Sequence, residues 1–131
     1  ILMGHIGDSR AYLLRNGQII QISDDHSMVA ELVRDGVLTE EQARIHPYRN
    51  VITQAVGAAD ELNVHTRRLE KTRGDKYLIC SDGLYEYVTK EEMQQLLTHY
   101  SPEDAAEMMI EKALDGGGKD NVTVLIAEVA L

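Results

Sequence analysis

The stretch YLICSDGLYEY, residues 77–87, joins an apolar run to a charged exit. Residues 77–80 are apolar and bounded by polar residues, which predicts a buried strand. The run stops at Ser81-Asp82-Gly83, so a carboxylate stands where the strand leaves the core. We expect Gly83 to let the backbone turn sharply beside it. The question is why a charge is placed at that exit.

Composition restricts the classes of protein to consider. The chain has 131 residues, 44% of them hydrophobic, which is the size of one ordinary domain. It lacks Trp and Phe, so we expect a core of Ile, Leu, Val, Ala and Met. A net charge of −9 argues against a nucleic-acid partner, because phosphates are neutralised by basic residues. The acidic balance is compatible with binding of hard cations.

Cysteine usage and hydropathy bear on location. Cys80 is the single cysteine and cannot form an internal disulfide, which indicates a reducing cytosol and a cytoplasmic protein. No apolar run approaches the roughly 20 residues of a membrane span, so no membrane partner is expected. The chain opens on apolar residues 1–6 as if inside a strand, which predicts an excerpt of a longer product.

Local signals predict an α+β fold with mostly antiparallel sheet. Asn16-Gly17 between two apolar runs predicts a hairpin, and Thr39 and Thr89 each begin a capping box before a helix. Ser101-Pro102 is a further helix start. Two consecutive helices lie between the early strands and the last one, which favours α+β over alternating α/β. Strands are expected at residues 1–6, 11–15, 18–22, 51–56, 63–69, 77–80 and 122–130. Helices are expected after Ser27 and ending at Gly36, after Thr39 and ending before Pro47, after Thr89, and after Ser101.

Three Gly/Asp elements stand at the ends of predicted strands and carry Asp8, Asp82 and Asp120. Carboxylates that converge in a cleft repel one another unless a cation neutralises them. Mg²⁺ and Mn²⁺ suit such a site, since both accept carboxylates and water. Asp and Gly are also common turn residues, and the pattern alone leaves both interpretations open.

Five segments of the chain carry a family resemblance. They resemble, in this order, the C-terminal half of the metal-dependent Ser/Thr protein phosphatases of type 2C, above all the small bacterial members. The segments are GHIGDSRAYLLRNGQIIQIS (4–23), DDHSMVAELVRDGVLTEEQA (24–43), HPYRNVITQAVG (46–57), YLICSDGLYEYV (77–88) and GGGKDNVTVLIAEV (116–129).

The resemblance implies a fold and a metal site. The fold would be part of an α-β-β-α sandwich of mostly antiparallel sheets flanked by helices. Asp82 and Asp120 match aspartates that bind a pair of metal ions, and Asp8 matches an aspartate on a third, weaker ion. Glu86 stands where many members have an aspartate. Residues 29–49 fall in a mobile flap linked to substrate selection.

The resemblance also implies an activity and its partners. The family hydrolyses phosphoserine and phosphothreonine in proteins with two, and in some members three, Mn²⁺ or Mg²⁺ ions. Its partners are phosphoproteins, including Ser/Thr kinases and their targets. The family's N-terminal half, with a further Asp-Gly ligand, has no counterpart here, so we expect the isolated chain to be inactive and to self-associate.

The alternative is a phosphatase-like module that binds partners without catalysis. Three retained aspartates, Asp8, Asp82 and Asp120, favour descent from an active enzyme. Gly116-Gly117-Gly118-Lys119 fails the phosphate-loop pattern, because Asp120 stands where Ser or Thr is required. The five histidines show no metal-ligand spacing, and His26 is expected to be structural.

Overall fold

The computed structural model describes residues 1–118 and 120–130, and these divide into two compact units. The first unit comprises residues 9–23 and 70–131 together with Ile1, and the second comprises residues 2–8 and 24–69.

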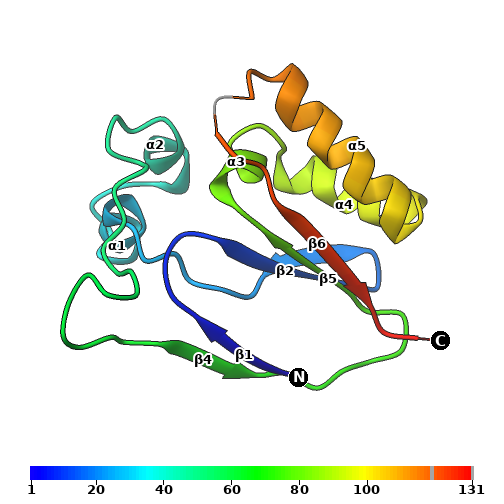
Figure 1. Ribbon diagram of the computed structural model, residues 1–131, viewed down its shortest axis with the longest axis horizontal. Coiled ribbons are helices and arrows are strands. Elements are labelled where there is room, and N and C mark those ends of the chain that lie inside the picture. Colours follow the sequence, from blue (N-terminus) through cyan, green and yellow to red (C-terminus); the bar gives the residue numbers. More distant parts are fainter. Residues whose placement is uncertain (119, 131) are drawn as a thin grey trace. The chain divides into compact units, whose positions relative to one another are not determined.

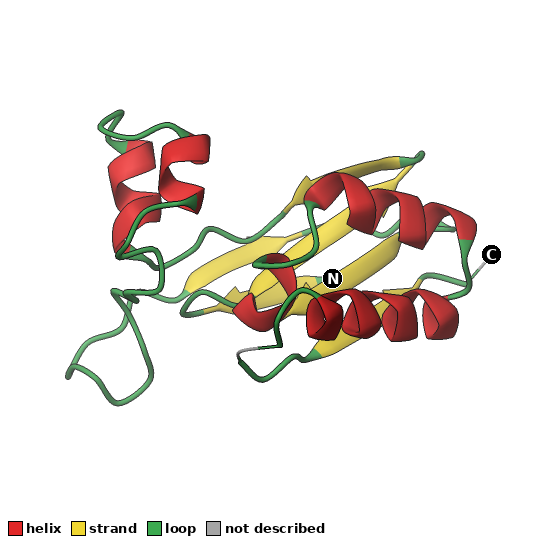
Figure 2. Cartoon of the chain, turned by 90° about the horizontal axis from the view of Figure 1, so that it is seen from above, coloured by secondary structure: helices red, strands yellow, loops and turns green. Residues whose placement is uncertain are grey.

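The first unit is a four-stranded antiparallel sheet covered by helices on one face. Its strand order is β3-β2-β5-β6, and Figure 1 shows these strands together. The strands are β2 (Arg10–Arg15), β3 (Gln18–Gln21), β5 (Lys76–Cys80) and β6 (Val124–Glu128), and the helices are α3 (Asp82–Tyr85), α4 (Lys90–His99) and α5 (Pro102–Asp115). Figure 2 shows α4 and α5 side by side over the sheet.

The core of this unit lies between the helices and the sheet. Successive residues of a strand point to opposite faces, so Leu78 and Cys80 face the helices while Ile79 faces away. The core cluster comprises Tyr12, Leu14, Ile19, Leu78, Cys80, Leu84, Val88, Met93, Leu96, Leu97, Ala105, Met109 and Ala113. On the opposite face Ile20, Ile79 and Leu125 remain about half exposed.

The second unit contains a two-stranded antiparallel ribbon and two short helices. The strands β1 (Leu2–His5) and β4 (His65–Arg68) pair with each other, and the helices are α1 (Met28–Arg34) and α2 (Glu40–Arg44). Ser27 caps α1 by accepting from Ala30 N–H. Thr39 and Gln42 form the capping box expected for α2.

The predicted class, α+β with antiparallel sheets, is confirmed. The hairpin is also confirmed, since Asn16 and Gly17 both have positive φ, at 52° and 74°, as a tight two-residue turn requires. The capping box at Thr89 and the start of α5 at Ser101 occur as predicted.

The strand expected at residues 51–56 is wrong. Ser27 and Ile52 form an isolated bridge, and the flanking bonds join Met28 N–H to Val51 O and Thr53 N–H to His26 O. Ser27, the partner of Ile52, is followed at once by α1, so the strand pairing cannot extend beyond this bridge. The short helix α3, which begins at Asp82, was not expected.

Candidate functional site

Hydrogen bonds join the segment after β5 to the segment before β6. Ser81 N–H donates to Thr123 O at 3.1 Å, and Thr123 N–H donates to Ser81 Oγ at 3.0 Å. The Ser81 hydroxyl also donates to Asn121 O at 3.3 Å. The segments that carry Asp82 and Asp120 are therefore neighbours, although 38 positions separate the two residues in the sequence.

Gly83 allows these two segments to approach closely. A Cβ at this position would lie 2.2 Å from the carbonyl oxygen of Asn121 and 3.0 Å from its carbon. Gly83 lies in α3, directly after β5, and is not among the glycines with positive φ, so its role here is not a left-handed conformation. The absence of a side chain serves packing instead, because any larger residue would displace the segment before β6.

Asp82 and Asp120 differ in their surroundings. Asp82 is half-buried and is the first residue of α3, where its carbonyl accepts from Glu86 N–H at 3.0 Å. Asp120 is exposed, and its Oδ1 accepts from Asn121 N–H at 2.7 Å. That bond orients the carboxylate beside the segment that Gly83 contacts. Lys119, in the predicted loop, lies outside the described residues.

The residues that follow Asp82 are anchored to β2. The Arg10 guanidinium lies over the Tyr85 ring, 3.7 Å from its centroid, and Arg10 Nη1 donates to Tyr12 Oη at 3.2 Å. A guanidinium over an aromatic face is attracted by the ring's negative face. This contact ties α3 to the sheet.

Asp8 lies in the second unit, half-buried, directly after Gly7 with φ 104°. Gly7 N–H donates to His26 Nδ1 at 3.0 Å, and His26 N–H donates to Gly7 O at 2.8 Å. His26 therefore bonds both the N–H and the carbonyl oxygen of Gly7, the residue before Asp8. Sequence reasoning expected His26 to be structural and missed this contact, for which the sequence offers no local signal.

Carboxylates are suitable ligands for a hard divalent cation, because Mn²⁺ and Mg²⁺ prefer oxygen ligands. Among residues 1–118 and 120–130, however, no group of three or more His, Cys, Asp or Glu side chains could hold a metal ion. Asp82 and Asp120 lie on adjacent segments of one unit, but two carboxylates do not complete a coordination shell. Further ligands must come from water or from other residues.

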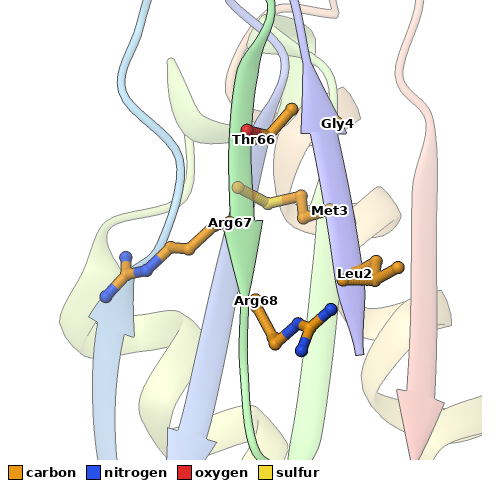
Figure 3. A pocket seen from close by; sticks show the side chains of 6 residues that line it. All are labelled: Leu2, Met3, Gly4, Thr66, Arg67 and Arg68. Atoms are coloured by element: carbon orange, nitrogen blue, oxygen red, sulfur yellow. The ribbon is translucent and has the colours of Figure 1, made fainter.

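A hollow of about 410 Å³ lies on the β1–β4 ribbon and contains none of these carboxylates. It is lined by Leu2, Met3, Gly4, Thr66, Arg67 and Arg68. Figure 3 shows that the side chains of Arg67 and Arg68 diverge, as successive residues of a strand do. They do not form a paired clamp for a phosphate group.

Known proteins match nearly the whole chain. The serine/threonine protein phosphatase PstP of Mycobacterium tuberculosis is 45% identical over 125 residues, which are 95% of this chain and 24% of PstP. The serine/threonine phosphatase stp of Listeria welshimeri is 39% identical over 129 residues, 98% of this chain and 51% of that protein. No family model matches the chain.

Solved structures agree in fold. The crystal structure of the M. tuberculosis phosphatase PstP/Ppp matches with a TM-score of 0.94 at 42% identity, over 99% of this chain and 55% of that chain. The PstP catalytic domain in complex with two manganese ions matches with a TM-score of 0.85 at 41% identity, over 99% and 54%. The resemblance inferred from the five segments is confirmed.

This chain spans about a quarter of PstP and about half of the Listeria phosphatase. In the part of the chain that the structure describes, no helix is long and apolar enough to cross a membrane.

Proposed function

We propose, from the relationship of this chain to a portion of the bacterial metal-dependent Ser/Thr phosphatases, that the protein to which it contributes hydrolyses phosphoserine and phosphothreonine in other proteins. One observation carries the proposal. The corner formed by residues 81–83 and 120–123 brings together the segment after β5, which carries Asp82, and the segment before β6, which carries Asp120. The match to Ser/Thr phosphatases over nearly the whole chain supports metal-dependent phosphatase chemistry at that corner.

In this proposal Asp82 and Asp120 are ligands of Mn²⁺ or Mg²⁺, and Asp8 is a ligand of a further ion. A related catalytic domain that matches 99% of this chain is a complex with two manganese ions. When bound, such ions supply an activated water and neutralise charge on the transferred phosphoryl group. The role of the chain is to hold these carboxylates on segments next to its strands, because positions tied to a sheet are held more accurately than positions on free loops.

We assign residues 1–131 to the C-terminal part of one phosphatase domain. The remaining ligands and the groups that hold the phosphate are then supplied by residues outside this chain. Residues 29–49, which include most of α1 and all of α2, form the segment proposed to act as a flap over the phosphoprotein substrate. The phosphoproteins include Ser/Thr kinases or their targets. The protein is proposed to be cytoplasmic, as the buried thiol of Cys80 favours.

The isolated chain is proposed to be inactive and to self-associate. The cross-strand neighbours Ile79 and Leu125 expose adjacent apolar side chains on the sheet face opposite the helices. Contiguous exposed apolar surface favours association. Light scattering that finds a monomer at micromolar concentration would contradict this.

The test of the function uses the full-length protein, a phosphoserine peptide and an aryl phosphate, with and without Mn²⁺. We expect hydrolysis of both substrates that is lost with a chelator and restored by excess Mn²⁺. A metal-independent rate, or no rate with either substrate, overturns the proposal. The second result would support the alternative, a phosphatase-like module that binds partners without catalysis.

A further inference from the structure

His26 connects three separate segments of the second unit. Its side chain and its backbone both bind Gly7, as described above, and its carbonyl accepts from Thr53 N–H at 2.8 Å. The residue is only 8% exposed, so water does not compete effectively for these bonds. The next residue, Ser27, caps α1. The turn before Asp8 is thus held against the start of α1 and against residue 53.

The bond from Gly7 fixes the proton on the imidazole. Because His26 Nδ1 accepts a backbone N–H, it carries no proton, and the neutral ring has its hydrogen on Nε2. Protonation would place a second N–H at Nδ1, facing the N–H of Gly7. Two donors cannot bond to each other, so the protonated ring must give up the turn.

The surroundings of His26 favour the neutral ring. The ring of His5, on β1, lies 5.3 Å from it, and His65, on β4, lies 6.5 Å from His5. Arg34, on α1, donates to Asp25 O at 3.2 Å. Burial is the main cause that lowers the pKa of His26, followed by the charges of His5, Arg34 and His65.

Two carboxylates of the segment before α1 complete these surroundings. Asp24 lies 3.7 Å from His65 Nε2 and opposes the shift in the pKa of His26. Asp25 is buried and is bound by Arg34 through its carbonyl oxygen. The lowered pKa of His26 shows that Asp24 does not offset the effect of burial and of the cationic neighbours.

We propose that His26 is a positioning residue for Asp8: its neutral imidazole holds the Gly7–Asp8 turn, and protonation releases that turn. The proposal rests on the proposed function in one respect, that Asp8 binds a metal ion. The position of Asp8 would then depend on pH through His26, which is not itself a metal ligand. The Mn²⁺ concentration needed for activity should then rise as pH falls below about 6.5, the ordinary pKa of histidine.

Two substitutions separate the hydrogen bond from the titration. In His26→Asn the amide Oδ1 replaces Nδ1 as acceptor but does not gain a proton in this pH range. In His26→Leu no acceptor remains. His99→Asn is the control, because His99 is an exposed imidazole on α4 in the other unit.

The first readout is the protection of the Gly7 amide against hydrogen exchange, followed by NMR in the full-length protein. In the wild type and in the control His99→Asn, we expect protection to fall as pH drops below about 6.5. In His26→Asn protection should be independent of pH, and in His26→Leu it should be low throughout. Wild-type protection that does not change with pH, or His26→Asn titrating like the wild type, overturns the proposal even if His26→Leu fails to fold.

The second readout is the Mn²⁺ dependence of aryl phosphate hydrolysis. Loss of one hydrogen bond should raise the half-saturating Mn²⁺ concentration of His26→Leu about fivefold, with kcat at saturating Mn²⁺ little changed. His26→Asn should restore the wild-type value at pH 7.5. An unchanged Mn²⁺ requirement in both variants, with the amide result as expected, overturns the positioning role. A wild-type protein without Mn²⁺-dependent activity refutes the proposed function instead, while the amide readout still tests the Gly7 clamp.

Discussion

At the corner of the first unit, Asp82 and Asp120 are held by sheet hydrogen bonds and by the contact of Gly83 with Asn121, whereas the turn before Asp8 in the second unit is held by an imidazole. The bonds described at the corner join backbone groups and a hydroxyl, which do not titrate near neutral pH. The turn depends on a ring whose proton state can change. The comparison shows that aspartates with one proposed role can be positioned by unlike means, with unlike responses to pH and to mutation.

The largest effect is expected at the corner itself. In the full-length protein, Asp82→Asn or Asp120→Asn keeps the size of the side chain and removes its charge. Activity on an aryl phosphate should fall roughly 100-fold or more, since even outer-shell substitutions at metal sites cost about 10–100-fold. Asp8→Asn should have a smaller effect, because its proposed ion is the weaker one.

Asp104→Asn is the matched control, since Asp104 is an exposed carboxylate in the first turn of α5. Its activity should equal that of the wild type. Activity of Asp82→Asn within a few-fold of wild type at saturating Mn²⁺ would rule out the ligand assignment.

The second effect concerns the contact that brings the two segments together. In Gly83→Ala the new Cβ would overlap the carbonyl of Asn121, so the segment that carries Asp120 must shift. Overpacking of this kind should lower the free energy of unfolding by about 1–3 kcal/mol and reduce metal-dependent activity as well. Urea unfolding and Mn²⁺ titration of activity measure the two losses.

Gly4→Ala provides the comparison, because its Cβ would meet only Val64 Cγ1 at an ordinary 3.8 Å. It should change neither quantity appreciably. If Gly83→Ala were as stable and as active as Gly4→Ala, the close approach at the corner would not position Asp120.

The residues that could be predicted from the sequence are those with local signals. Asn16-Gly17, the Thr39 and Thr89 capping boxes and Ser101-Pro102 each determine structure within a few positions, and each was confirmed. The aspartates could be proposed as ligands because short motifs surround them. The α+β class followed from the order of these elements.

The features that sequence missed depend on distant partners. The need for glycine at position 83 comes from Asn121, and the bond of His26 comes from Gly7, 19 positions away. The β-branched run at 51–53 is typical of a strand but finds a partner only around residues 26–28. Propensity cannot show which partner is available, because tertiary contacts decide it.

The third prediction uses pH to separate the two units. In the first unit the hydrogen bond from Arg15 is the main cause that lowers the pKa of Asp75 below its ordinary 3.8, so its stabilising effect is present above that pH and is lost as pH falls below it. In the second unit the pKa of His26 is lowered from 6.5, so stability is full above 6.5 and declines as pH falls toward the lowered pKa. The second unit should therefore loosen first.

Exchange protection factors, which remove the intrinsic pH dependence of exchange, test this order. The amide of Thr53, bonded to His26 O, should lose protection as pH falls below 6.5 toward the lowered pKa of His26. The amide of Thr72, bonded to Asp75 Oδ2 at 2.8 Å, should keep its protection over that range. Simultaneous loss at both amides would show that the units do not differ in this way.

The smallest effect is expected from the two capping boxes, one in each unit. Thr39→Ala removes the acceptor for Gln42 N–H at the start of α2, in the proposed flap, and Thr89→Ala removes the equivalent acceptor for Glu92 N–H on α4. Each should cost about 1 kcal/mol of helix stability.

Because a flap contacts the peptide rather than the reacting group, Thr39→Ala should lower kcat/KM for a phosphopeptide a few-fold while leaving aryl phosphate hydrolysis nearly unchanged. Thr89→Ala should lower the free energy of unfolding without changing the ratio of the two substrates. Equal ratios in both variants would make residues 29–49 a structural segment without a part in substrate selection.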